Sequence, residues 1–258
     1  MSLARLNDYL WPEERTEYQF HLSLCVYRKN LHLFRILCFL FYCIPSTIYM
    51  FMVGQVGFID HFFFFTNWGH FACTAYFGLA SWLELKTPVD APPKQGFLWK
   101  FTHILFELAF AMEFTIALFF WAVLAPQYFP TIVDEPDFGA ILLMNILMHA
   151  VTPLAMWIEL SLNYIEFHWR HCLVFLPLVS LVYDIVNALG VLVFNISIYQ
   201  PVIDWKSWKT LLMIVVALIL GFGGFGVGYW IHKVKSRRFE RKRLLITDTN
   251  EEALDPSF

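Results

Sequence analysis

Charged residues are scarce in this 258-residue chain, at 15% of the sequence. Soluble domains carry roughly 25% charged and about half apolar residues, whereas hydrophobic residues here reach 59% and aromatic residues alone 19%. This composition excludes an ordinary soluble domain and predicts an integral membrane protein. We therefore expect membrane lipids, and no nucleic acid, among its partners.

Cysteine patterns, targeting signals and repeats are also missing. The cysteines are odd in number and fit neither a disulfide framework nor a zinc site, so we expect reduced thiols, no metal site and no cofactor. The first thirty residues are polar and resemble neither a secretory signal nor a transit peptide, so targeting information is expected to be internal. The five cysteines are Cys25, Cys38, Cys43, Cys73 and Cys172.

Long apolar segments are what the sequence does have. Six of them have the length of about 20 residues that a bilayer core requires. They cover residues 33–54, 62–83, 97–124, 138–160, 172–194 and 208–231. We predict an all-α fold, a polytopic membrane bundle of six transmembrane helices.

The chain divides into a membrane domain and two tails. The N-terminal tail (1–32) has a helix-start signature at Pro12 followed by apolar residues at helical spacing, which is compatible with an interfacial amphipathic helix or with a plain solvated tail. The six-helix domain covers 33–232, and a basic, then acidic tail covers 233–258. Gly224 and Gly228 have the spacing that permits close helix approach, and we expect packing within the chain.

Basic residues predict the orientation in the membrane. Six spans place both termini on one side, and that side, with Arg35 counted in the N-terminal set, holds 16 of the 18 Lys and Arg residues. By the positive-inside rule both tails face the cytosol, or the matrix of a mitochondrion. The organelle stays open between endomembrane or plasma membrane and the mitochondrial inner membrane.

A polar stripe interrupts the fourth apolar segment. Asn145, His149 and Thr152 share one face at helical spacing. An ionisable imidazole at this depth is costly, so it indicates a functional site. Pro153 has no amide hydrogen and frees the carbonyl of His149, which predicts a kink there.

Other polar residues fall inside the apolar segments. Glu113 and Asp184 each have a structural interpretation as a hydrogen-bond partner of His70 or His149, and for either residue alone that interpretation is favoured. The structural interpretation of Thr66 is a hydroxyl bonded to a carbonyl one helical turn back. His103 and Glu107 are expected to form a simple pair one helical turn apart. The remaining intramembrane polar residues are Thr66, Asn67, Glu113, Asp184 and Asn187.

Three short motifs resemble one membrane-protein superfamily. Phe65-Thr66-Asn67-Trp68 is followed by Ala75-Tyr76-Phe77-Gly78, and Asn145-Ile146-Leu147-Met148-His149 has Glu159 ten residues further on. Together with the segment 198–205, they resemble the rolling-stone proteins and the androgen-induced, androgen-dependent membrane hydrolases. The resemblance covers residues 62–231.

This resemblance implies an intramembrane lipid-ester hydrolase. In the hydrolase branch, the residues matching Thr66 and His149 are the catalytic pair, and the substrates are fatty-acid esters of hydroxy fatty acids. An imidazole within hydrogen-bond reach can activate a hydroxyl for attack on an ester. We expect the pair within one-water distance, in a pocket open to the outer leaflet, with Asn67 or Asn145 as an oxyanion donor and His70, Glu113 and Asp184 in support.

Two other functions stay open. Ala150 and Val151 stand where the hydrolases have hydroxyl residues, and the rolling-stone branch supplies no activity to transfer. The alternative is therefore a non-catalytic accessory subunit of a larger membrane complex, such as a respiratory one, with neighbouring subunits as partners. A haem-binding bundle would require His70 and His149 to face each other.

Overall fold

The computed structural model describes residues 3–11, 28–53, 58–86, 96–196, 199 and 205–252. Regular structure in these residues is helical, and no strand occurs among them. The all-α class predicted from the sequence is therefore confirmed for the described part of the chain.

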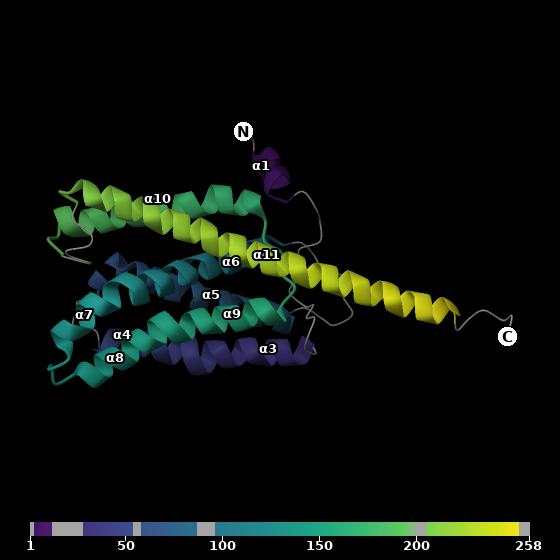
Figure 1. The fold of residues 1–258 in the computed structure, drawn as a ribbon, viewed down its shortest axis with the longest axis horizontal. Helices are drawn as coiled ribbons and strands as arrows, with labels where there is room; N and C mark the ends of the chain where they lie inside the picture. Colours follow the sequence, from purple (N-terminus) through teal and green to yellow (C-terminus); the bar gives the residue numbers. More distant parts are fainter. Residues whose placement is uncertain are drawn as a thin grey trace.

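Six rods of helix lie side by side with alternating direction (Figure 1). In chain order they are α3–η1–α4 (Arg28–Leu37, Cys38–Cys43, Ile44–Val53), α5 (Phe65–Lys86), α6–η3–α7 (Phe97–Phe119, Phe120–Leu124, Ala125–Ile132), α8–η4–α9 (Phe138–Ile146, Leu147–Val151, Thr152–Leu162), α10 (Trp169–Leu192) and α11 (Trp208–Glu252). A short helix α1 (Leu3–Leu10) and a 3-10 turn η2 (Asp60–Phe63) lie outside these rods.

Five helices are long and apolar enough to cross a membrane. Their length and composition indicate an integral membrane protein, in agreement with the sequence. These candidate spans are Arg28–Met52, Phe97–Ile132, Phe138–Leu162, Trp169–Leu192 and Trp208–Arg238.

Helix α5, predicted as the second span, is not in that set although it has 22 residues. It contacts both α3 and α6, and its polar side chains Asn67, His70 and Glu84 are buried. Because these groups face other helices instead of lipid, α5 can be less apolar than the helices around it. The six-span count stays a prediction.

Three of the rods contain a π-helical turn: η1, η3 and η4. The predicted kink at Pro153 corresponds to η4, which ends just before Thr152. The carbonyl of His149, freed by the proline, accepts a hydrogen bond of 2.9 Å from Trp121 Nε1 on η3. A side chain of one π-helical turn therefore satisfies the carbonyl that is left free in the neighbouring π-helical turn.

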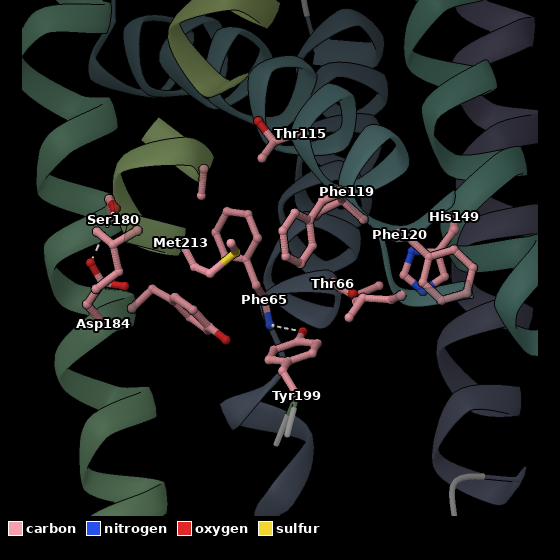
Figure 2. A pocket seen from close by; sticks show the side chains of 15 residues that line it. Phe65, Thr66, Thr115, Phe119, Phe120, His149, Ser180, Asp184, Tyr199 and Met213 are labelled. Carbon is pink, nitrogen blue, oxygen red and sulfur yellow. Dashed lines mark hydrogen bonds between the residues drawn. The ribbon is translucent and has the colours of Figure 1, made fainter. Parts of the chain in front are cut away.

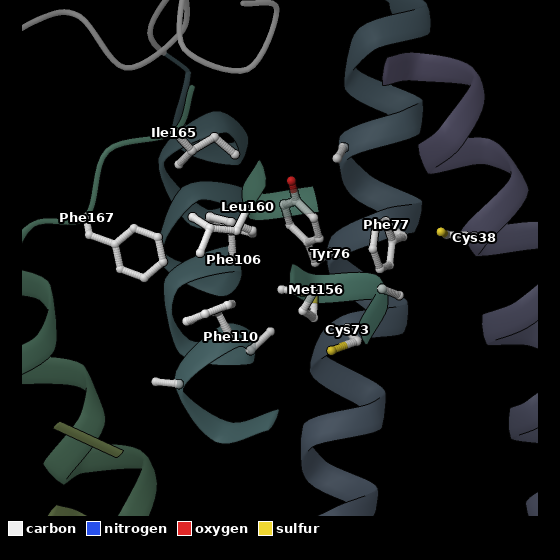
Figure 3. Close-up of a cluster of buried hydrophobic side chains, with 14 of the residues drawn as sticks. Cys38, Cys73, Tyr76, Phe77, Phe106, Phe110, Met156, Leu160, Ile165 and Phe167 are labelled. Atoms are coloured by element: carbon white, nitrogen blue, oxygen red, sulfur yellow. The ribbon is translucent and has the colours of Figure 1, made fainter. Parts of the chain in front are cut away.

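An aromatic core joins α5, α6 and α9. Tyr76 and Phe77 of α5 and Phe106 and Phe110 of α6 are all at most 1% exposed (Figure 3). Phe167, in the connection before α10, packs edge-to-face on Phe106 and Phe110, with ring centroids 5.6 and 5.7 Å apart. The connection is thereby anchored on the bundle.

Helix α11 approaches this core through glycines. A Cβ at Gly224 would lie 2.9 Å from the Phe114 side chain of α6, and one at Gly228 only 2.4 Å from the Phe167 ring. Both glycines thus pack within the chain, as expected from their spacing.

Arg35 is enclosed at the centre of an ion-pair cluster and is 0% exposed. Its guanidinium donates to Glu159 at 2.6 and 3.0 Å and to Glu84 at 3.0 Å. Glu159 Oε1 also accepts from Tyr76 and Asn163. Arg35, one of the basic residues assigned to the inner side, thereby also ties α3, α5 and α9 together.

The two ends of the chain differ from the predicted tails. The proposed interfacial helix after Pro12 lies outside the described residues, and α1 precedes it. At the other end, α11 continues to Glu252, through most of the segment predicted as a tail. Of the cysteines, Cys25 lies outside the described residues, and the other four are free and buried.

Candidate functional site

A cavity of about 90 Å³ lies between α5, α6, η3, η4, α10 and α11. Its walls are mainly aromatic and aliphatic, with a few polar groups that converge on the space (Figure 2). The polar lining residues are Thr66, Thr115, His149, Ser180, Tyr183, Asp184 and Tyr199.

Thr66 lies in the first turn of α5, which begins at Phe65. The partial positive charge at a helix N-terminus stabilises negative charge nearby. A hydroxyl placed here is therefore better able to carry developing alkoxide character than one in mid-helix.

Tyr199 closes the N-terminus of α5 from outside the helix. Its hydroxyl accepts a 3.0 Å hydrogen bond from the Phe65 amide and lies in hydrogen-bonding contact with the Thr66 side chain. Burial raises the pKa of Tyr199, so its phenol keeps its proton at neutral pH. Its φ of 63° is left-handed, a conformation that costs energy in a non-glycine residue and is often found at functional sites.

His149 lines the cavity from η4. Its ring stacks on Phe120 of η3, with centroids 3.5 Å apart and planes 3° from parallel. The side chain is buried, and its Nδ1 has no hydrogen-bond partner among the described residues. An unpartnered buried imidazole nitrogen beside a cavity is available to a ligand, because leaving it unsatisfied is costly.

Asp184 of α10 supplies a carboxylate to the same cavity. Ser180, one turn earlier on the helix, donates to its Oδ2 at 3.5 Å. Thr66, His149 and Asp184 are therefore the predicted site residues that the fold brings to one space. The other four lie elsewhere.

The two asparagines considered as oxyanion donors are engaged with their own surroundings. Asn67 Nδ2 donates to the His61 carbonyl at 2.9 Å, and Asn145 Nδ2 donates to the Ile141 carbonyl at 2.8 Å. Neither side chain lines the cavity. Each fastens its own helix or the turn before it.

His70 belongs to a separate, closed polar cluster. Its Nε2 lies 3.2 Å from the Ser46 hydroxyl and 3.0 Å from that of Thr47, and its Nδ1 lies 3.4 Å from Thr152 Oγ1. Thr152 also contacts the Tyr42 hydroxyl. The residues predicted to share one stripe thus diverge: Thr152 joins His70, while His149 faces the cavity.

Glu113 is buried against α5, and the two histidines that a haem would need are separated. Glu113 is 1% exposed and packs against Gly69, where a Cβ would lie 2.6 Å from its Oε1. His70 and His149 do not face a common space, since His149 lines the cavity and His70 does not. At about 90 Å³, that cavity is also below the 300–1,000 Å³ typical of cofactor pockets.

No family model, known protein or solved structure matches this chain. The superfamily resemblance therefore stays an expectation from the motifs. The site has to be argued from its own geometry.

Sequence reasoning missed two residues of the site. Phe120 was not singled out, because one phenylalanine among many carries no signal. Tyr199 had a signal, since it falls in the segment 198–205 that took part in the resemblance, but its hydroxyl was not assigned a role. Its contact with Thr66 spans more than a hundred residues and follows only from the fold.

Proposed function

We propose that this integral membrane protein hydrolyses lipid esters, with Thr66 as the nucleophile and His149 as the general base. One observation carries the proposal: a helix-terminal hydroxyl and a buried imidazole with an unpartnered nitrogen, from distant helices, line one small cavity. The motifs shared with the membrane hydrolases support the same pair.

The chemistry follows from the two groups. The Thr66 oxygen attacks the ester carbonyl carbon while its proton passes to His149, directly or through one water. The bond to the alcohol then breaks, and the departing oxygen takes the proton from His149. Water attacks the acyl-threonine, giving one proton to His149, and the fatty acid leaves as Thr66 recovers its hydrogen.

The negative charge that develops on the ester oxygen requires donors. Tyr199 stays protonated and lies beside Thr66, so its hydroxyl can turn toward that oxygen. The positive end of α5 acts in the same direction. Together these groups form the proposed oxyanion site.

The size of the cavity restricts the substrate. A space of about 90 Å³ accommodates an ester group and a few carbons, whereas a long acyl chain must extend beyond it. In a membrane protein, such chains can lie in the surrounding lipid. Among such esters, the resemblance to the hydrolase branch favours fatty-acid esters of hydroxy fatty acids as the substrate class.

The test is hydrolysis of such an ester by the purified full-length protein. Thr66→Ala and His149→Ala are each expected to abolish activity, since nucleophile and base act as a unit. Thr131→Ala is the matched control, because this exposed threonine only donates to the Tyr128 carbonyl of its own helix. Mass spectrometry of the quenched wild-type reaction should find the acyl group on Thr66.

Two results would contradict the proposal. Activity that persists in both alanine variants would exclude this pair as the catalytic machinery. A wild type that folds and binds lipid but hydrolyses no ester would favour the accessory-subunit alternative.

A further inference from the structure

A second group of chemically active side chains lies far from the cavity, near the start of α6. His103 and Glu107 occupy successive turns of α6, and His171 lies in the first turn of α10. All three are at most 1% exposed. At 1.5 Å per residue along α6, His103 and Glu107 lie roughly 18 and 12 Å from Thr115 in the cavity wall.

The side chains converge closely. His171 Nδ1 lies 2.6 Å from Glu107 Oε2, and His103 Nε2 lies 3.5 Å from Glu107 Oε1. One potential ligand atom from each of the three residues lies within 4.8 Å of the other two. Donors bound to one zinc ion at 2.0–2.1 Å in a tetrahedron lie about 3.4 Å apart, so small side-chain shifts bring these atoms to that spacing.

Main-chain carbonyls orient both imidazoles. His171 Nε2 lies 3.0 Å from the Leu10 carbonyl, and His103 Nε2 lies 2.7 Å from that of Glu166. For His171 this leaves Nδ1, which faces Glu107, for a metal, and metal-bound histidines are commonly held in this way through the second ring nitrogen. The His103 Nε2 lies between the Glu166 carbonyl and Glu107, so this ring must turn to give a metal a nitrogen lone pair. The Glu107 carboxylate is likewise fixed, because Oε1 accepts the His168 amide hydrogen at 2.6 Å.

Charge favours a cation here. Glu107 is buried, and its ion-pair partners among the described residues are His103 and His171. A buried carboxylate is costly unless its charge is compensated. A divalent cation bound by the carboxylate compensates that charge.

We propose that His103, Glu107 and His171 bind a divalent transition-metal ion, with zinc as the best-fitting case. Two histidines and one glutamate are a known set of three protein ligands for zinc, in which a water or another small ligand takes the fourth position. The metal fastens α1 to the bundle, since Leu10 holds His171 and the Trp11 ring packs 4.4 Å from the His171 ring. The cysteine-based expectation of no metal site did not consider this histidine pair.

The direct test is metal content. Purified full-length protein is stripped with a chelator, incubated with Zn²⁺, desalted and analysed for bound metal. The wild type should retain about one zinc ion per chain, while His171→Ala and Glu107→Gln should lose at least tenfold in affinity. His61→Ala is the matched control, because His61 is also buried but lies on η2, and it should retain the metal.

Two further measurements guard against misfolded variants. Co²⁺ added to the stripped wild type should produce the visible absorption bands of a tetrahedral site, and Zn²⁺ should raise the thermal unfolding midpoint of the wild type alone. Wild-type protein that retains no zinc and shows no cobalt bands would overturn the proposal, and so would zinc retained equally by His171→Ala. Ester hydrolysis is not the readout, so the two proposals fail separately.

Discussion

Among single residues, Tyr199 offers the most direct test of the proposed site, through its hydroxyl. It combines a left-handed backbone, a buried phenol and contact with the first turn of α5. If it stabilises the oxyanion, Tyr199→Phe should lower kcat about 100-fold with little change in KM, as removal of one such donor does.

The control for Tyr199 is another tyrosine at the same end of the bundle. Tyr128 is 39% exposed on α7, so Tyr128→Phe should leave kcat unchanged. Steady-state kinetics on both variants, with circular dichroism to verify folding, distinguishes the outcomes. An equal fall in kcat in both variants would mean that the loss is not specific to the cavity.

Arg35 is the residue whose loss should most affect stability. Arg35→Ala leaves the buried carboxylates of Glu84 and Glu159 without this cation, and breaking such a buried pair costs about 3–5 kcal/mol. Arg28 also pairs with Glu84, at 3.3 Å, but its side chain is 28% exposed. Arg28→Ala should therefore cost about 1 kcal/mol or less.

Denaturant unfolding in detergent micelles measures both changes. The prediction concerns the difference between the two variants, because both remove one positive charge near the same carboxylate. If Arg28→Ala and Arg35→Ala destabilise equally, the buried cluster does not hold α3, α5 and α9 together.

At the scale of the element, α11 offers a matched pair of glycines. A Cβ at Gly228 would collide with the buried Phe167 ring, whereas a Cβ at Gly223 meets nothing within 4 Å. Overpacking typically costs about 1–3 kcal/mol, so Gly228→Ala should lower the free energy of unfolding by that amount. Gly223→Ala should be neutral or slightly stabilising, because alanine favours helix.

Thermal unfolding of the two glycine variants tests whether Gly228 packs within the chain or against another chain. A normal midpoint for Gly228→Ala, accompanied by loss of a dimer in sedimentation, would show that this face meets another chain. Both variants change one hydrogen to a methyl group on the same helix, so helix propensity alone cannot separate them.

The elements show what a sequence can and cannot predict. Apolar length predicts the rods closely: the segment 97–124 lies within Phe97–Ile132, and 138–160 lies within Phe138–Leu162. The π turns leave no trace in hydropathy, because apolar residues occupy every face of these helices. Helix α5 shows the converse problem, since a helix surrounded by other helices need not look like one surrounded by lipid.

The site was predictable only in outline. The motifs placed Thr66 and His149 together, and both line one cavity, whereas their catalytic use stays a prediction. The expected donors Asn67 and Asn145 bind nearby carbonyls, and Tyr199 arrives from a distant connection. Tertiary contacts of this kind depend on how rods pack, which no local pattern encodes.

For the whole molecule, the decisive prediction is the side on which the tails lie. Six crossings and the 16 of 18 basic residues predict both tails on one face, on the cytosolic or matrix side. With five crossings, they would lie on opposite faces. Tags at the two ends, tested for protease access in sealed vesicles, should therefore be cleaved together or protected together.

The π turn η4 has a rotational consequence. Each residue of an α-helix turns the chain by about 100°, so a turn that holds one extra residue offsets the phase of everything after it. Within that turn His149 faces the cavity, and beyond it Glu159 binds Arg35. Deleting a single residue such as Ala150 would rotate the helix before it by about 100° relative to the helix after it. The His149 ring could then not face the cavity while Glu159 still binds Arg35.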